Sequence, residues 1–277
     1  REECERRYGY MKDWNVSKVT DMRALFAPAA GVEGFYENFN EPLNDWDVSN
    51  VEYMSRMFEE LLSFNQPLNN WNVSNVRDMS LMFAHATSFN QTLNDWNVGN
   101  VEIMNSMFKN ATSFNQPLND WNVGRVVDME SMFAGATSFN QTLNDWNVGR
   151  VEIMNRMFEN ATSFNQPLND WDVSNVVDMN RMFENATSFN QPLNNWNVSK
   201  VVDMAGMFAG ATSFNQPLND WNVGREEGRN RTLDDVTDMF LNATSFNQPL
   251  DNWDMTWVIY MDNMFNGATS FNQEQTI

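Results

Sequence analysis

The chain has 277 residues and a formal net charge of −20, from 37 acidic and 17 basic side chains. This charge argues against a nucleic-acid partner, because phosphate binding needs clustered lysines and arginines. The sequence has no run of about 18 apolar residues, so it predicts no membrane-spanning helix.

A charged segment, residues 1–10, precedes the first repeat. It has no apolar stretch, so no signal peptide is visible, and the charged residues before Cys4 do not fit a lipidation site. Cys4 is the single cysteine, and we expect either a terminal thiol or an intermolecular disulfide there. Residues 11–277 are expected to form one repeat domain.

The tryptophans define the repeat. From Trp46 to Trp221 they recur every 25 residues, and the first and last steps of the series are 32 residues long. We count ten repeats and expect insertions near residues 27–35 and 224–232. One unit cannot bury its own apolar residues, so stacked units with a continuous core are expected, which is the architecture of a solenoid.

Each repeat has two expected elements. Trp71 and Val73 alternate around a polar residue, which is the period of a strand. The M-x-x-M-F segment that begins at Met79 has the spacing of one helical face, and Asp78 is placed to cap it. We therefore expect an α/β repeat solenoid with one short parallel strand and one short helix or 3-10 turn per coil.

Residues 88–112, SFNQTLNDWNVGNVEIMNSMFKNAT, resemble the BspA-like surface-protein repeats, which are relatives of leucine-rich repeats. The residues that carry the match are Phe89, Asn90, Gln91, Leu93, Trp96, Val98, Val101, Met104, Met107, Phe108 and Ala111. The resemblance covers about residues 11–273 and implies a leucine-rich-repeat-like, right-handed coil. It also implies a cell-surface or secreted setting, and the family has no catalytic residues to transfer.

Two rows of Asp and Asn (Asx) flank the tryptophans, and we expect them to point outward, away from the core. The first Asx row, before each Trp, includes Asp45, Asn70, Asp95, Asp120, Asp145, Asp170 and Asp220. The second Asx row, after each Trp, includes Asp47, Asn72, Asn97, Asn122, Asn147, Asp172, Asn197 and Asn222. This surface is either a solvated face with hydrogen-bonded Asn side chains or a binding face for a basic protein, a polar glycan or calcium. Calcium has the weakest support, because the glycine-rich calcium-binding repeat is absent.

Three other features recur. The Asn after the second Phe of each unit occurs in all ten repeats, in Phe-Asn-Gln or, at Asn40, Phe-Asn-Glu, and predicts a structural hydrogen bond to the backbone. A single threonine column, Thr87 to Thr269, makes ice binding a remote third function. Glycosylation sequons, which are either used or a by-product of the repeat, occur at Asn15, Asn72, Asn110, Asn160, Asn185, Asn197, Asn230 and Asn242.

The pattern breaks near the ends of the repeat array. The second insertion holds the densest basic cluster within the repeats, and two aromatic residues depart from the last repeat. They are either tolerated surface changes or contacts with a neighbouring molecule. These candidate end contacts are Arg225, Arg229, Arg231, Trp257 and Tyr260.

Nothing in the sequence indicates catalysis. There is one histidine, no glycine-rich phosphate loop and no zinc-ligand spacing. The paired carboxylates recur in coil after coil, whereas an active site normally occurs once in a chain. We expect no enzyme and no cofactor, but an extracellular or cell-surface scaffold with a structural or adhesive role. It would bind protein or glycan and self-associate end to end. The alternative is a monomeric module that binds a cationic protein, a glycan or divalent ions on the two Asx rows.

Overall fold

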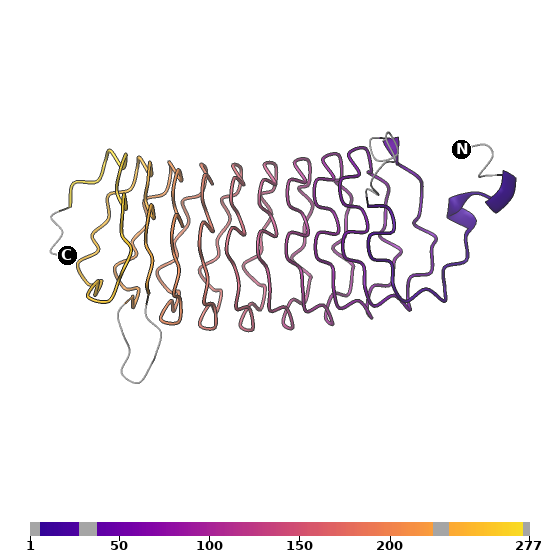
Figure 1. Cartoon of the computed structure of the whole chain (residues 1–277), viewed down its shortest axis with the longest axis horizontal. Helices are drawn as coiled ribbons and strands as arrows, with labels where there is room; N and C mark the ends of the chain where they lie inside the picture. The colour runs from indigo at the N-terminus through magenta and orange to yellow at the C-terminus, as the bar shows by residue number, and fades with distance from the viewer. Residues whose placement is uncertain (1–5, 28–37, 224–232, 274–277) are drawn as a thin grey trace.

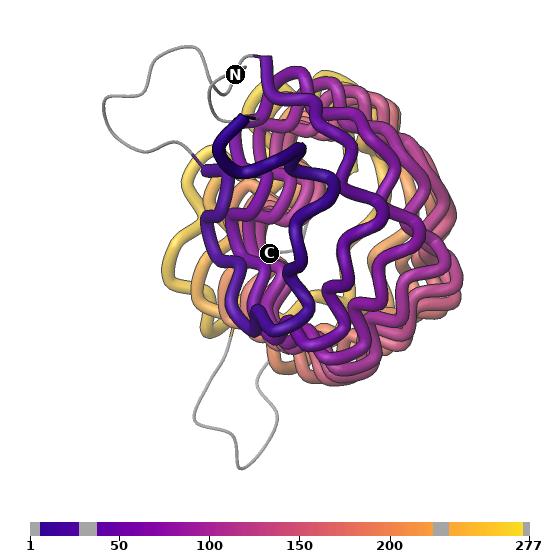
Figure 2. Tube along the Cα trace, turned by 90° about the vertical axis from the view of Figure 1, so that its right-hand side faces the viewer, coloured from indigo at the N-terminus to yellow at the C-terminus, as the bar shows by residue number. Residues whose placement is uncertain are grey.

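The computed structural model describes residues 6–27, 38–223 and 233–273. Successive coils lie side by side along one axis and form a rod, with the first repeats at one end and the last repeats at the other (Figure 1). Seen along this axis, successive coils follow nearly the same outline (Figure 2). The second insertion lies outside the described residues, as does all of the first except Ala27.

Parallel β-bridges join the coils. Among the described residues, nine isolated bridges connect ten positions, from Asp21 through Asp78 to Tyr260, with one position per coil. We call this column of ten positions the bridge ladder. It confirms the ten stacked coils and their parallel arrangement. The one helix with defined bounds in the described part is the 3-10 helix η1, Met11–Asp13, which opens the first coil.

The predicted strand is wrong in position. The bridge of this coil lies at Asp78, and the segment from Trp71 to Val73 has no bridge. Backbone turns enclose that segment, because Trp71 N donates to Leu68 O (3.1 Å) and Val76 N donates to Val73 O (2.9 Å). Trp71 and Val73 are nevertheless buried, so a short extended segment between two turns produced the alternation that predicted a strand.

The predicted helix is also wrong. Leu81 and His85 have positive φ angles of 57° and 61°, in the left-handed region that interrupts a right-handed helix. Alternate backbone N–H groups donate to the next coil, as Leu81 N does to Asn105 O (2.9 Å). The intervening groups close turns within the coil, as Met82 N does to Met79 O (3.2 Å). Consecutive turns therefore produce the three- and four-residue spacing that predicted a helix.

The sequence contained a signal of these turns. At the position of His85, later coils have only Asn or Gly, which tolerate the left-handed region better than other residues do. Gly135 needs this freedom for a second reason, because an added Cβ atom there would collide with Asn110 Oδ1 of the preceding coil.

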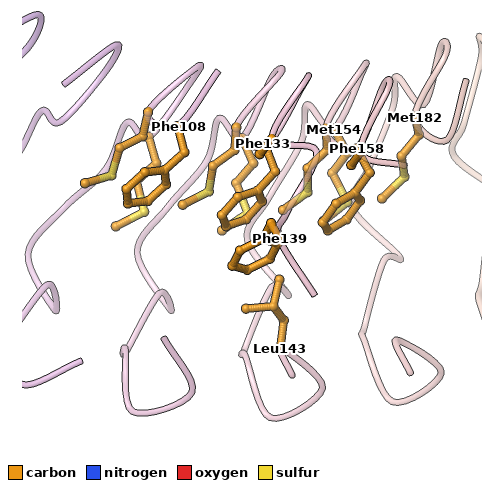
Figure 3. Packing of buried hydrophobic residues seen from close by; sticks show 14 of the residues in the cluster. Phe108, Phe133, Phe139, Leu143, Met154, Phe158 and Met182 are labelled. Carbon is orange, nitrogen blue, oxygen red and sulfur yellow. The ribbon is translucent and has the colours of Figure 1, made fainter. Parts of the chain in front are cut away.

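The core is a stack of identical columns. Phe108, Phe133 and Phe158 lie in one row (Figure 3), with ring centroids 5.7 Å apart at each step. Trp121 and Trp146 stack in another column at 6.3 Å. Each buried indole N–H from Trp71 to Trp253 also donates to a leucine carbonyl of the preceding coil. This confirms the predicted continuous core, in which each coil completes the packing and hydrogen bonding of its neighbour.

Candidate functional site: the Asx-lined face

The two Asx rows form one exposed face of the rod, which we call the Asx-lined face. All fifteen predicted positions are exposed, while the tryptophan between each pair is at most 3% exposed. The predicted outward orientation is therefore confirmed. The face is not a β-sheet surface, however, because the bridge ladder follows a different stretch of each coil.

The second Asx row stabilises its own turn. Asn97 Oδ1 accepts a hydrogen bond from Gly99 N (3.2 Å), and Asn122 Oδ1 accepts one from Gly124 N (3.1 Å). This is an Asx turn, in which the side chain binds the backbone two residues further on. In Asp172, hydrogen bonds from the side chain and then the backbone N–H of Ser174 lower the pKa of the carboxyl group. From Asp47 to Asn197, one oxygen of each side chain in this row is thus occupied by the fold.

The first Asx row alternates between two roles. Asp120 Oδ2 accepts a hydrogen bond from Asn94 Nδ2 of the preceding coil at 2.5 Å, and Asp170 Oδ2 accepts the same bond from Asn144. In the described part of the chain, the carboxylates of Asp45, Asp95 and Asp145 make no such bond. The fold therefore leaves a carboxylate unused in the second, fourth and sixth coils, which no single repeat would have revealed.

The asparagine of Phe-Asn-Gln is structural, as predicted. Asn90 Oδ1 accepts hydrogen bonds from Asn115 N at 2.9 Å and from Gln116 Nε2 at 3.1 Å, both in the next coil. The hydrogen bond from the backbone N–H of one such asparagine to Oδ1 of the one before it recurs at every step from Asn40 to Asn272. These side chains join coils, so their acceptor oxygens are not free for a ligand.

The histidine, the threonine column and the acidic side chains form no further site in the described residues. His85 is half-buried beside Asn110, at 3.5 Å from its amide nitrogen. Most of the threonine column is half-buried, with Thr212 and Thr269 exposed, which disfavours a flat ice-binding surface. No group of three or more His, Cys, Asp or Glu side chains that suits a metal ion occurs in residues 6–27, 38–223 and 233–273.

The sequons fall on two kinds of turn. Asn15, Asn72 and Asn197 lie in the exposed Asx turns after the tryptophans, where Oδ1 is already bonded to the backbone. Four others have positive φ angles in the left-handed column, and Asn110 is the half-buried member of that group. These four are Asn110, Asn160, Asn185 and Asn242, whereas Asn230 lies outside the described residues.

Only two of the predicted end contacts lie in the described part of the chain. Trp257 is 48% exposed and Tyr260 is 57% exposed, both in the last coil. Arg225, Arg229 and Arg231 lie outside the described residues, as does Cys4. Within the described part of the chain, no helix has the length and apolar character needed to cross a bilayer.

Stacked coils, a continuous core and a face repeated in each coil define a tandem-repeat solenoid protein. Five overlapping segments match the family described as "Mycoplasma protein of unknown function, DUF285": residues 2–116, 31–146, 91–185, 139–237 and 229–276. Together these segments span almost the whole chain, which therefore belongs to this family.

Sequence and structure comparisons add little to this family assignment. No curated protein sequence matches the chain significantly. Among solved structures, the crystal structure of a TLR13–ssRNA13 complex is similar at 11% identity and a TM-score of 0.27. That match covers 74% of this chain and 38% of the other chain, so the present chain spans well under half of that protein. The description of the fold therefore rests on the contacts reported above.

Proposed function

We propose that this protein is a non-catalytic scaffold of the cell surface or extracellular space, with a structural or adhesive role. The observation that carries the proposal is the repetition of one exposed motif, Asx-Trp-Asx, around a buried tryptophan in coil after coil. A face of this kind presents many equal, weak contacts at regular intervals. Such a surface suits a partner with many similar groups, because linked contacts add through avidity.

The carboxylates indicate the chemistry of the partner. Asp45, Asp95 and Asp145 are exposed, and in the described structure they form no side-chain hydrogen bond. The whole chain carries a net charge of −20, which attracts cationic groups from a distance. The proposed partner is therefore a protein surface with several lysines or arginines.

The alternative is a monomeric recognition module for one soluble ligand, either a cationic protein, a polar glycan or divalent ions. The second Asx row supports it, because its side chains are exposed and their Asx turns use only one oxygen, as in Asn97, Asn122 and Asn147. A module of this kind would bind its ligand with a fixed stoichiometry, whereas a scaffold would bind a polymer better than the monomer units of that polymer.

Binding to immobilised polylysine tests the proposal, with free lysine and calcium as competitors. The test variant is Asp45→Asn, Asp95→Asn and Asp145→Asn together. The control is Glu60→Gln, Glu102→Gln and Glu152→Gln, which removes the same number of exposed carboxylates elsewhere on the coils. We expect the test variant to bind about tenfold more weakly than the control.

Equal binding by the two variants would mean that net charge alone attracts polylysine, and the Asx-lined face would lose its role. Saturation by a single ligand with a fixed stoichiometry would favour the recognition module. Protease treatment of intact source cells, followed by detection of the native protein, tests the proposed surface location.

A further inference from the structure

A groove of about 480 Å³ lies across the first three coils. Its lining residues are all polar, and each occupies the third, fourth or sixth position after the tryptophan of its coil. None of them belongs to the Asx-lined face, whose positions directly flank the tryptophan. A groove of this size suits a small molecule or a short stretch of a polymer.

Two asparagine amides in the groove are held by the fold, but only through their nitrogens. Asn50 Nδ2 donates to Ser17 O (2.8 Å), and Asn75 Nδ2 donates to Ser49 O (2.7 Å). Each amide is therefore fixed by a backbone carbonyl of the preceding coil. Oδ1 of both side chains accepts no hydrogen bond in the described structure, so the groove offers two preorganised acceptors.

Later coils use the same amide oxygen differently. Asn100 Oδ1 accepts a hydrogen bond from Arg125 of the next coil (2.9 Å), and Asn175 Oδ1 accepts one from Lys200. The two groove amides lack such a partner, because the coil after each supplies another asparagine at that position. Their oxygens thus remain available to a ligand.

Three charged side chains line the groove. Lys18 is exposed, and its ammonium group forms no ion pair in the described structure. Arg77 Nε lies 3.7 Å from Glu52 Oε2, which is longer than a hydrogen bond. These two side chains are 58% and 45% exposed, so their ion pair is weak. Two cations and one carboxylate give the groove a local charge of +1, in a chain whose net charge is −20.

This combination of side chains is specific to the first coils. The sixth position after the tryptophan holds Thr20, Glu52 and Arg77 in coils 1 to 3, whereas coils 4 to 8 have only Glu or Val there. The Asx-lined face repeats in coil after coil, but this groove does not. Its lining can therefore distinguish one ligand from another.

We infer that the groove binds an acidic saccharide. The sugar carboxylate pairs with Lys18 and Arg77 through charge-assisted hydrogen bonds. The sugar hydroxyls both donate and accept, so they donate to the oxygens of Asn50, Asn75 and Glu52. The inference goes beyond the scaffold proposal, because it concerns other residues and a ligand of the opposite charge.

Other classes of ligand match the groove less well. A phosphate group offers mainly acceptors, so it leaves the amide oxygens without donors and is repelled by Glu52. An apolar ligand removes water from the charged groups without replacing their hydrogen bonds. A basic ligand is repelled by two cations. Repulsion between an acidic saccharide and the rest of the chain is screened beyond about 8 Å at physiological salt.

Isothermal titration calorimetry of the whole chain with trigalacturonate, a saccharide of uronic acids, tests the inference. The comparison ligands are the neutral saccharide maltotriose and inorganic phosphate. We expect saturable binding of trigalacturonate and at least about tenfold weaker binding of the other two, because only trigalacturonate supplies both carboxylates and hydroxyl donors.

The test variant is Lys18→Gln with Arg77→Gln, which removes both cations and keeps polar side chains. We expect it to bind trigalacturonate about tenfold more weakly than the wild type. The matched control is Arg150→Gln with Lys200→Gln, which removes the same charges from exposed positions in coils 6 and 8. This control should keep the affinity of the wild type, and an unchanged melting temperature shows that each variant is folded.

Four outcomes would overturn the inference. They are no saturable binding of trigalacturonate, an equal loss in the control, phosphate binding as tight as that of trigalacturonate, and equal affinity for maltotriose. The scaffold proposal has a separate readout. The Asp45, Asp95 and Asp145 variant should still bind trigalacturonate, and the Lys18 and Arg77 variant should still bind polylysine.

Discussion

At the scale of single residues, asparagine is the side chain that joins one coil to the next. Asn90 shows the pattern, because its one carbonyl oxygen accepts from the backbone and from a glutamine of the following coil. The sequence predicted a structural role here from repetition alone. It did not predict that both donors lie in the neighbouring coil.

Asn90→Ala removes both bonds and leaves the N–H of Asn115 without its acceptor. We expect a loss of about 1–3 kcal/mol in the free energy of unfolding, measured by urea denaturation. Asn195→Ala is the matched control, because that side chain is exposed and makes no hydrogen bond in the described structure. A loss in the control as large as that in Asn90→Ala would contradict the structural role.

Two aspartates of the bridge ladder, Asp128 and Asp178, respond to pH differently from Asp172 of an Asx turn. Asp128 Oδ1 accepts a hydrogen bond from Glu130 N at 2.9 Å, but burial raises the pKa of this carboxyl group. Its charge therefore weakens the fold near neutral pH, and this cost disappears as the pH falls and the folded state takes up a proton. Asp172 is the opposite case, since the contact with Ser174 lowers its pKa and stabilises the fold above the pKa of the unfolded chain.

Asp128→Asn keeps the acceptor and removes the buried charge. We expect its melting temperature to lie above that of the wild type at about pH 7, with the difference lost at about pH 3, below the ordinary aspartate pKa. Asp172→Asn should instead lower the melting temperature at about pH 7. Thermal denaturation followed by circular dichroism measures both melting temperatures. A shift of the same sign in the two variants would contradict the opposite effects of the Asp128 and Asp172 charges on stability.

At the scale of the element, the unit of the fold is the contact between coils. Trp121 packs 6.3 Å from Trp146 of the next coil and donates its indole N–H to Leu93 O of the preceding coil at 2.8 Å. One side chain therefore links three coils. The burial of the tryptophans could be predicted from the repeat, but the partner of the indole N–H could not, because it lies 28 residues earlier in the chain.

Trp121→Phe keeps an aromatic ring in the column and removes the hydrogen bond to Leu93 O. We expect a loss of about 1–3 kcal/mol in the free energy of unfolding. Trp257→Phe, at a side chain that is 48% exposed, should cost less than about 0.5 kcal/mol. Urea denaturation of both variants provides the comparison, and equal losses would show that the buried bond is unimportant.

At the scale of the whole molecule, hydrogen bonds between coils protect the backbone in the interior of the rod. Interior N–H groups such as that of Phe83 are bonded to the next coil, at 2.9 Å from Met107 O, whereas those of Asn263 and Phe265 have no acceptor in the described structure. Local opening is therefore expected first at backbone groups that lack a hydrogen bond to a neighbouring coil.

Amide hydrogen exchange measures this difference. We expect fast exchange at Asn263 and Phe265 and slow exchange at Phe83 in dilute solution. Equally slow exchange at all three positions would contradict the protective role of the hydrogen bonds between coils.

The sequence by itself determined the number of coils, their parallel stacking, the buried columns and the outward Asx rows, because each follows from a period that places like residues above one another. Tertiary structure alone decided the backbone path within a coil. Turns with left-handed residues replaced the predicted helix, and the bridge ladder moved from the tryptophan to Asp78. The physical reason is that backbone groups within a coil are satisfied by the next coil, so local periodicity reports which side chains are buried but not which hydrogen bonds the backbone makes.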